Sequence, residues 1–344
     1  TVLEPGSVVT ISGVARYEFV PANPDCLGLN YLATEPRPIR QATVQLIDAS
    51  TGAVLGSTRT DDNGNYAITV DPGVNVRLRV RAELKRSGAP SWDVDVRDNT
   101  SNTGSALQNR PLYVLDTGVF SSGTVDQTRD VTATTGWNGT SYSATRAAAP
   151  FAVLDAIYSA MQLVLSVDAT APFPPLDAFW SVNNSPEEGE GSFDDNIASG
   201  KIGTSFYSSG IDSLFLLGKE NEDTEEFDDH VIVHEWGHYF EDVFSRSDSI
   251  GGAHGTGDRL DMRLAFGEGW ATALSGIALD NDTYCDTRAM RQASGFRIGI
   301  ENNSYGPDGW FSEFSILQII YDLWDQDIDG ADTGSIGFAP IYEA

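Results

Sequence analysis

The residues His234-Glu235-Trp236-Gly237-His238 match the pattern HExxH, and they use two of the four histidines in a chain of 344 residues. Residues i and i+4 lie on one face of an α-helix, one above the other. Two imidazoles placed in this way can hold one zinc ion, and the glutamate between them can reach a water molecule beside the ion. The pattern therefore predicts a helix that carries His234 and His238 as zinc ligands and Glu235 as general base.

A catalytic zinc site needs a third protein ligand, and the segment 266–274 contains a candidate. Its sequence, Phe-Gly-Glu-Gly-Trp-Ala-Thr-Ala-Leu, places Glu268 among apolar residues in a stretch of helical composition. We expect Gly267 and Gly269 to allow this helix to approach the first one closely. The alternative is that Glu268 is one more surface acid in an acidic chain, but its apolar neighbours favour a zinc ligand.

The net charge of −29, from 50 acidic and 21 basic residues, excludes some classes of partner. Nucleic acids and anionic membranes would be repelled. Three explanations remain for the acidic surface. We favour a solvated surface in a salty or extracellular setting; the others are calcium binding by carboxylate clusters and attraction of cationic substrates.

No apolar run reaches the roughly 20 residues of a membrane span. The longest, 150–167, is interrupted by Asp155, Ser159 and Gln162, and we predict a core helix there.

The organisation along the chain predicts two domains. Short β-branched or alternating runs separated by turn residues are typical of a β-sandwich, and they lie at 7–15, 41–48, 65–70, 76–82, 92–96 and 112–120. The segment 132–147 is rich in Thr, Ser, Gly and Asn, so we divide the chain into 1–137 and 138–344. In the second part we expect a helix at 148–166, a loop at 172–200, a strand at 213–217 and a late helix at 315–324.

A candidate calcium loop follows the late helix. Asp325, Asp327, Asp329 and Asp332 alternate with other residues, and Gly330 stands at the sixth position, as in the first half of an EF-hand loop. The twelfth position is Ile336, so the bidentate glutamate of that motif is missing. A calcium site and a plain acidic turn both remain open.

The two cysteines and the two other histidines leave several alternatives open. Cys26 and Cys285 form either a disulfide of a secreted protein or two separate thiols. His230 lies one turn before His234, and we expect it to contact solvent or substrate rather than metal. His254 lies in a glycine-rich loop, where most histidines are simply exposed, although a role in the site stays open.

The motifs together resemble a known family. Residues 227–238, Phe-Asp-Asp-His-Val-Ile-Val-His-Glu-Trp-Gly-His, followed by Gly267-Glu-Gly-Trp270, are similar to the fungalysin branch of the thermolysin-like zinc metallopeptidases, the gluzincins. Residues 319–324 resemble that family's helix after the site, so the resemblance covers roughly 204–324. Separately, the segment 44–73 resembles a carboxypeptidase-regulatory or prealbumin-like β-sandwich.

These resemblances imply a multidomain fold in which an N-terminal β-sandwich is followed by an α+β thermolysin-like zincin domain. In such a domain the strand at 213–217 would be an edge strand that pairs with an extended peptide substrate.

The sequence departs from the family at two positions. Where the family often has an acid four residues after the ligand glutamate, this chain has Thr272. The family also places a histidine before the late helix to stabilise the developing oxyanion, but no histidine follows His254. The candidate replacements are Tyr305, the indole N–H of Trp310, and His254, of which we favour Tyr305 as the catalytic donor.

The function predicted from the sequence is a secreted zinc-dependent metallopeptidase that hydrolyses peptide bonds in proteins or peptides. We expect zinc as cofactor, calcium as a second candidate, no nucleic-acid partner and no membrane span, and we make no prediction of oligomeric state. One alternative is a surface adhesin or structural protein with a degenerate zincin domain. Another is a zincin that hydrolyses a substrate other than a peptide.

Overall fold

The computed structural model describes residues 7–302, 304–326 and 334–344. Within these residues the chain forms eighteen strands in three sheets, together with six α-helices. The fold is therefore rich in β-structure, and the candidate site lies in the smaller helical part.

The largest sheet has nine strands and takes segments from both halves of the chain. The order of seven of them is β13 (Phe206–Ser208), β14 (Ser213–Leu216), β12 (Leu176–Trp180), β7 (Trp92–Arg97), β6 (Asn75–Arg86), β3 (Ala42–Asp48) and β4 (Val54–Arg59). The short strands β8 (Val114–Asp116) and β9 (Phe120–Ser121) also pair with β6. Alternation of buried and partly buried residues is clear in the first two thirds of β6, which explains why a strand is predicted there from sequence.

The other two sheets are smaller. In the five-stranded sheet, β1 (Val9–Phe19) pairs with β2 (Glu35–Pro38), β5 (Asn65–Val70), β10 (Gln127–Thr128) and β11 (Val131–Ala133). The four-stranded sheet has the order β15 (Gly218–Lys219), β16 (Asp223–Thr224), β17 (Thr283–Arg288) and β18 (Ser294–Gly299). This last sheet joins the segment just before the HExxH residues to a hairpin that follows Glu268 in the chain.

The predicted fold class, a β-sandwich followed by a separate α+β thermolysin-like zincin domain, is wrong. β12 pairs in parallel with β7, with Leu176 opposite Val94, so the nine-stranded sheet continues across the predicted boundary at 137/138. One continuous hydrophobic core likewise contains residues from Val9 to Phe338. The reason is that β7 has backbone hydrogen-bonding groups along both of its edges. β6 pairs with one edge, and β12, which follows the helix α1 in the chain, pairs with the other.

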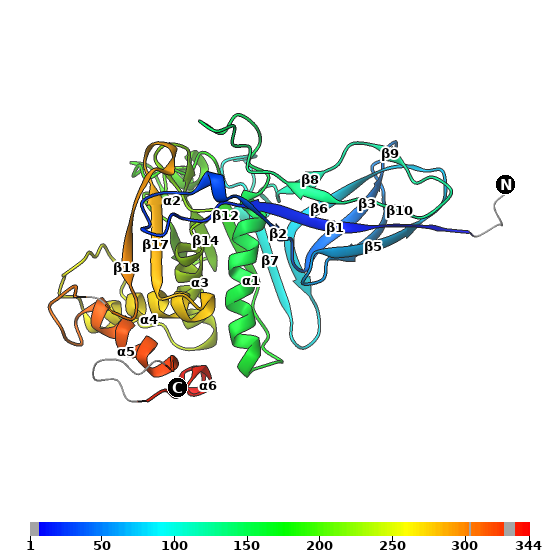
Figure 1. Ribbon diagram of the computed structural model, residues 1–344. Coiled ribbons are helices and arrows are strands. Elements are labelled where there is room, and N and C mark those ends of the chain that lie inside the picture. Colours follow the sequence, from blue (N-terminus) through cyan, green and yellow to red (C-terminus); the bar gives the residue numbers. More distant parts are fainter. Residues whose placement is uncertain (1–6, 303, 327–333) are drawn as a thin grey trace.

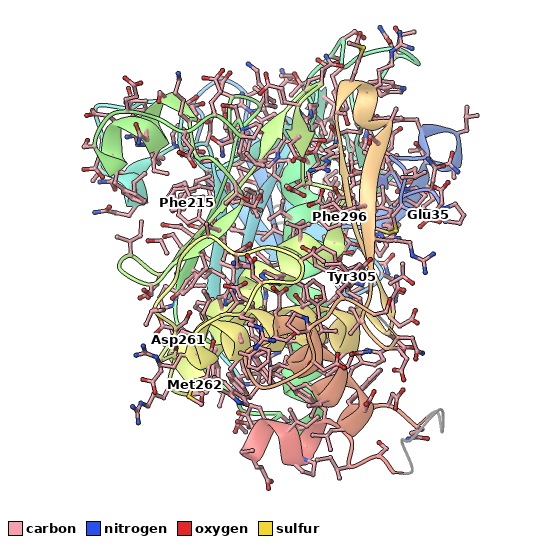
Figure 2. The ribbon with its side chains drawn as sticks, turned by 90° about the vertical axis from the view of Figure 1, so that its left-hand side faces the viewer. Glu35, Phe215, Asp261, Met262, Phe296 and Tyr305 are labelled. Atoms are coloured by element: carbon pink, nitrogen blue, oxygen red, sulfur yellow. A yellow bond between two sulfur atoms is a disulfide. The ribbon has the colours of Figure 1, made fainter. Side chains whose placement is uncertain are left out.

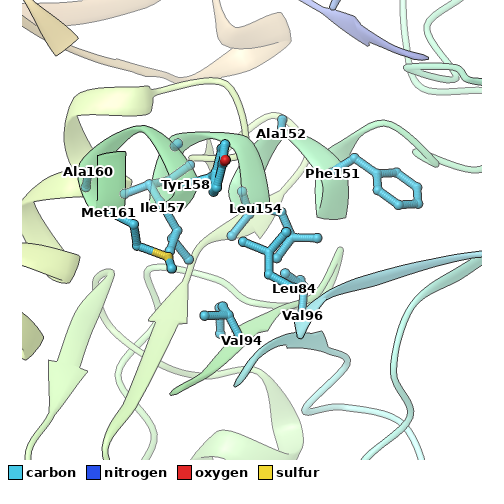
Figure 3. Packing of buried hydrophobic residues seen from close by; sticks show 14 of the residues in the cluster. Leu84, Val94, Val96, Phe151, Ala152, Leu154, Ile157, Tyr158, Ala160 and Met161 are labelled. Carbon is cyan, nitrogen blue, oxygen red and sulfur yellow. The ribbon is translucent and has the colours of Figure 1, made fainter. Parts of the chain in front are cut away.

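The helix α1 (Ala149–Val167) covers the sheet where its two halves meet. Phe151, Leu154, Ile157 and Met161 are buried, and Figure 3 shows this helix above Leu84, Val94 and Val96 of the sheet. Each such side chain contributes about 1.5–3 kcal/mol through burial. By length and composition α1 could cross a membrane, but 61% of its apolar window is buried within the protein. It packs here as the predicted core helix.

The remaining helices gather on one side of the molecule. They are α2 (Phe193–Ser199), α3 (Asp229–Phe244), α4 (Met262–Leu279), α5 (Glu313–Trp324) and α6 (Phe338–Glu343). In Figure 1, α3, α4 and α5 lie beside β17 and β18, and the strands of the N-terminal third extend to the other side of α1. The HExxH helix predicted from the sequence is α3, and the helix predicted to carry Glu268 is α4.

The strand at 213–217 does not have the position that the resemblance implied. β14 is buried along its whole length, pairing in parallel with β12 and antiparallel with β13. Its residues 213–215 therefore have neighbours on both sides, and the prediction of an edge strand is wrong. Among the described strands, β13 is the edge strand at this end of the sheet.

A disulfide joins Cys26 to Cys285, which settles the alternative that the sequence left open. It connects the segment after β1 to β17, and the two Cα atoms are 5.2 Å apart.

In Figure 2, Phe296 marks β18, the partner strand of β17, and Tyr305 marks the loop between β18 and α5.

Candidate metal centre

The structure brings the three predicted metal ligands together. His234 and His238 lie one turn apart on α3, and their Nε2 atoms are 3.1 Å from each other. Oε2 of Glu268, on α4, is 3.3 Å from Nε2 of His234 and 3.4 Å from Nε2 of His238. Three ligand atoms that converge in this way form a group compatible with a metal ion, which confirms the coarser part of the cofactor prediction.

The spacing of these atoms matches the size of a small tetrahedral site. Zinc–nitrogen and zinc–oxygen bonds of about 2.0–2.2 Å give tetrahedral edges of about 3.3–3.6 Å. The three edges observed here are 3.1, 3.3 and 3.4 Å. Two imidazole nitrogens and one carboxylate oxygen are also a donor set that zinc prefers, so the residues present fit that metal.

Two glycines allow close packing around α4, one against α3 and the other against α5. A Cβ on Gly237 would lie 3.0 Å from Cα of Ala271, so α3 and α4 nearly touch there. A Cβ on Gly269 would lie 2.6 Å from Cβ of Ile316, so Gly269 faces α5 rather than α3. The expectation that Gly267 and Gly269 bring α4 against α3 is wrong, because Gly237 on α3 itself performs that role.

Thr272 contacts the outer nitrogen of His234, a candidate ligand. Its hydroxyl is 3.0 Å from Nδ1 of His234, while Nε2 of the same ring faces Glu268. Hydrogen bonding at the outer ring nitrogen fixes the orientation of a metal-binding histidine. The sequence identified Thr272 only as a departure from the family, and the structure assigns it this contact.

His254 and Glu313 also reach the centre, and the sequence analysis did not predict Glu313. Nε2 of His254 is 3.4 Å from Oε2 of Glu268 and 3.7 Å from Oε2 of Glu313. Glu313 is 7% exposed at the first turn of α5. The sequence analysis named His254 as one of three candidate donors, whereas nothing in the sequence around Glu313 distinguishes it from other acids.

The charges in the centre stabilise one another. Burial alone would raise the pKa of Glu268, but hydrogen bonds from His234 and His238 lower it far below its usual range. Burial would lower the pKa of His238, but its contact with Glu268 raises that pKa to about 9. Burial raises the pKa of Glu313, although the facing His254 opposes this shift. The centre is therefore built around a carboxylate that is charged at neutral pH.

Three other residues singled out from the sequence, Glu235, His230 and Tyr305, differ in burial and in hydrogen-bond partners. Glu235 is 8% exposed on α3, next to His234, and its charge acts on His238. His230 is buried, and its Nε2 lies 3.2 Å from the carbonyl oxygen of Asn281, so it faces the protein rather than solvent or the centre. The hydroxyl of Tyr305 donates to the carbonyl oxygen of Arg297 at 3.3 Å. A catalytic role of Tyr305 stays a prediction.

The candidate calcium loop cannot be placed as a whole. Asp325 directly follows α5 as its C-terminal cap residue. Asp327, Asp329 and Asp332 lie outside the described residues.

Comparisons with known proteins identify no family. No family model and no curated protein matches the chain. Among solved structures, a 9R-lipoxygenase from Cyanothece PCC8801 is similar at 14% identity with a TM-score of 0.20. The alignment covers 50% of this chain and 26% of the lipoxygenase. A likeness of this size carries no argument about fold or function, so the interpretation of the centre depends on its own geometry.

Proposed function

We propose that this protein is a zinc-dependent metallopeptidase that hydrolyses peptide bonds in proteins or peptides. The observation that carries the proposal is the convergence of His234, His238 and Glu268 at 3.1–3.4 Å, with Glu235 of the same HExxH sequence beside them. The similarity of these motifs to the gluzincins supports the same activity.

In the proposed reaction, His234, His238 and Glu268 hold the metal and Glu235 handles the proton. Bound zinc supplies Lewis-acid activation of a water molecule and polarises the substrate carbonyl. Glu235 accepts the proton of the attacking water and then donates it to the leaving amine. Burial of Glu235 keeps bulk water from competing for that proton.

A hydrogen-bond donor for the developing oxyanion completes the mechanism. Of the three donors named from the sequence, His254 is placed against the ligand Glu268, so we assign this role to it ahead of Tyr305. A donor of this kind contributes about 3–4 kcal/mol to the barrier.

We further propose that the protein is secreted. The Cys26–Cys285 disulfide supports this location, since disulfides persist mainly in oxidising compartments. The net charge of −29 agrees with a solvated extracellular surface.

The test is cleavage of casein and a mixed peptide library by purified protein. We expect cleavage by the zinc-loaded protein, its loss after chelation with 1,10-phenanthroline, and its return when zinc is added back. Glu235→Gln is the matched control, because it removes the general base while the three ligands stay. This variant should retain one equivalent of zinc and cleave at least about 10²-fold more slowly.

A folded, zinc-loaded wild-type protein that cleaves no member of the library would contradict the proposal. The interpretation would then shift to a structural or adhesive protein with a degenerate metal centre, or to a substrate of another chemical class.

A further inference from the structure

A second group of acidic side chains lies apart from the candidate metal centre. Asp223 and Glu225 come from β16 and the residue after it, and Asp286 comes from β17. One carboxylate oxygen from each lies within 4.8 Å of the other two. We call Asp223, Glu225 and Asp286 the carboxylate triad.

The register of the sheet explains why the triad shares one face. Asp223 pairs with Arg288 in the antiparallel ladder of β16 and β17. Continuing this register places Glu225 opposite Asp286, and residues two apart on a strand point to the same side. Like charges directly opposite each other destabilise a sheet. The repulsion is therefore relieved only by a bound cation or by protonation of the carboxylates.

Neighbouring acids are paired, whereas each member of the triad keeps one buried carboxylate oxygen without a hydrogen-bond partner among the described residues. Glu226 is paired with Arg146, and the carboxylate of Asp228 accepts hydrogen bonds from the backbone and hydroxyl of Thr287 at 2.8 and 2.9 Å. By contrast, Asp223 Oδ1, Glu225 Oε2 and Asp286 Oδ1 are buried with no hydrogen-bond partner among the described residues. Glu225 as a whole is only 3% exposed.

The one arginine beside the triad does not neutralise it. Arg288 acts on Asp223 and Asp286 electrostatically, yet in the described part of the chain it forms no ion pair with them within 4.0 Å. Its guanidinium lies over the ring of Phe296, 5.5 Å from the centroid. Burial and then the charge of Asp286 raise the pKa of Asp223 to about 7, and burial raises that of Asp286 to about 6. The triad therefore strongly favours a cation or protons.

We propose that the carboxylate triad is a binding site for a hard divalent cation, with calcium as its ligand. Calcium takes oxygen ligands at 2.3–2.6 Å, so two oxygens on one ion lie at most about 5 Å apart. The triad meets this limit with three carboxylates. Glu225 has a buried oxygen, Oε2, without a hydrogen-bond partner among the described residues, and a bound cation would satisfy its carboxylate.

Calcium at this place would hold the start of α3 in position. The triad joins β16 to β17 just before the N-terminal cap of α3, and Asp228 at that cap is itself bound to Thr287 of β17. Glu225 also interacts electrostatically with Glu235. The inferred site thus stabilises the sheet on which the HExxH helix begins, and it does not depend on the proposed peptidase activity.

The experiment is a calcium titration of the full chain at pH 7.5, after one equivalent of zinc has been added. Isothermal titration calorimetry with calcium chloride should detect one site, and calcium should raise the Tm. Glu225→Gln and Asp286→Asn should each weaken calcium binding by at least about tenfold, because each removes one charged ligand. Two independent variants are used so that a folding defect in one does not decide the result.

Two variants serve as controls. Asp194→Asn changes an exposed acid of α2, and Asp329→Asn changes the acidic segment after α5; both should bind calcium like the wild-type protein. A wild-type protein that binds no calcium would overturn the proposal, as would unchanged binding by both triad variants. If only Asp329→Asn lost calcium binding, the calcium site would be assigned to the segment after α5, and the proposal for the triad would be rejected.

Discussion

The hydroxyl of Thr272 lies 3.0 Å from Nδ1 of His234, on the side of the imidazole away from Glu268. Thr272 stands one turn after Glu268 on α4, so one helix supplies both a candidate ligand carboxylate and a hydroxyl that contacts a candidate ligand histidine. The two contacts fix the ring between α3 and α4. An acid is not needed at this position, because a hydroxyl reaches the same nitrogen.

Thr272→Val should weaken zinc binding by about 10–100-fold, because valine has nearly the same shape but cannot hydrogen-bond to Nδ1 of His234. The measurement is competition for zinc with a chelator of known affinity. Thr272→Ser keeps the hydroxyl and should bind zinc like the wild-type protein. Equal affinity in all three proteins would show that the contact does not orient the ring.

His254→Ala should lower kcat by about 10²–10³-fold while one equivalent of zinc remains bound, because the variant removes the proposed oxyanion donor and none of the three ligands. Tyr305→Phe is the matched comparison and should leave kcat nearly unchanged. A loss of zinc from His254→Ala would instead make this residue a fourth ligand. A large effect of Tyr305→Phe would return the donor role to the tyrosine favoured from sequence.

Gly269→Ala should lower the free energy of unfolding by roughly 1–3 kcal/mol, since overpacking between helices costs about this much. The added Cβ would lie 2.6 Å from Cβ of Ile316 and 2.8 Å from the carbonyl oxygen of Glu313 on α5. Gly267→Ala is the control on the same helix, because its Cβ would find its nearest atoms at 3.5 Å. That variant should be neutral or gain about 0.5–1 kcal/mol from reduced backbone freedom. Denaturant unfolding of the zinc-saturated proteins makes the comparison.

The pH dependence of stability should contain a contribution from His230. Burial lowers the pKa of His230 in the folded protein from 6.5 to about 4. Between these values the unfolded chain binds more protons, so the stabilising contribution is complete above pH 6.5 and falls as the pH decreases to about 4. The slope attributable to this residue is at most about 1.4 kcal/mol per pH unit.

The difference in unfolding free energy between the wild-type protein and His230→Gln, measured from pH 7 to pH 4, isolates this contribution. The buried acids titrate in both proteins and cancel in the difference. A difference that does not change with pH would show that His230 titrates alike in the folded and unfolded chains.

Much of the local structure could be predicted because its causes are local. Alternating residues in β5 and β6, and the apolar face of α1, indicate strand and helix without reference to the rest of the chain. The HExxH spacing and the apolar setting of Glu268 likewise identified the ligands that the structure brings together. Side chains at positions i and i+4 lie on the same face of a helix in any fold, so this pair can be recognised from sequence alone.

The arrangement of the sheets could not be predicted in this way. β12 lies within a segment rich in proline and asparagine that was predicted to be a loop, and its pairing with β7 joins Val94 to Leu176. No short sequence pattern identifies which distant strand will pair with a given strand. The same limit applies to Glu313, which reaches the centre from a third helix, whereas His254 was already named from the sequence as one of three candidate donors. It also applies to the carboxylate triad, whose members become neighbours only through the register of β16 and β17.

The disulfide between Cys26 and Cys285 spans 259 positions of the chain. A single backbone cut anywhere between these residues leaves both pieces covalently attached, so neither can diffuse away. Nicked molecules would migrate as one species until a reducing agent is added. Under the proposed peptidase function, a cut made here by another copy of the protein would therefore leave the two pieces joined.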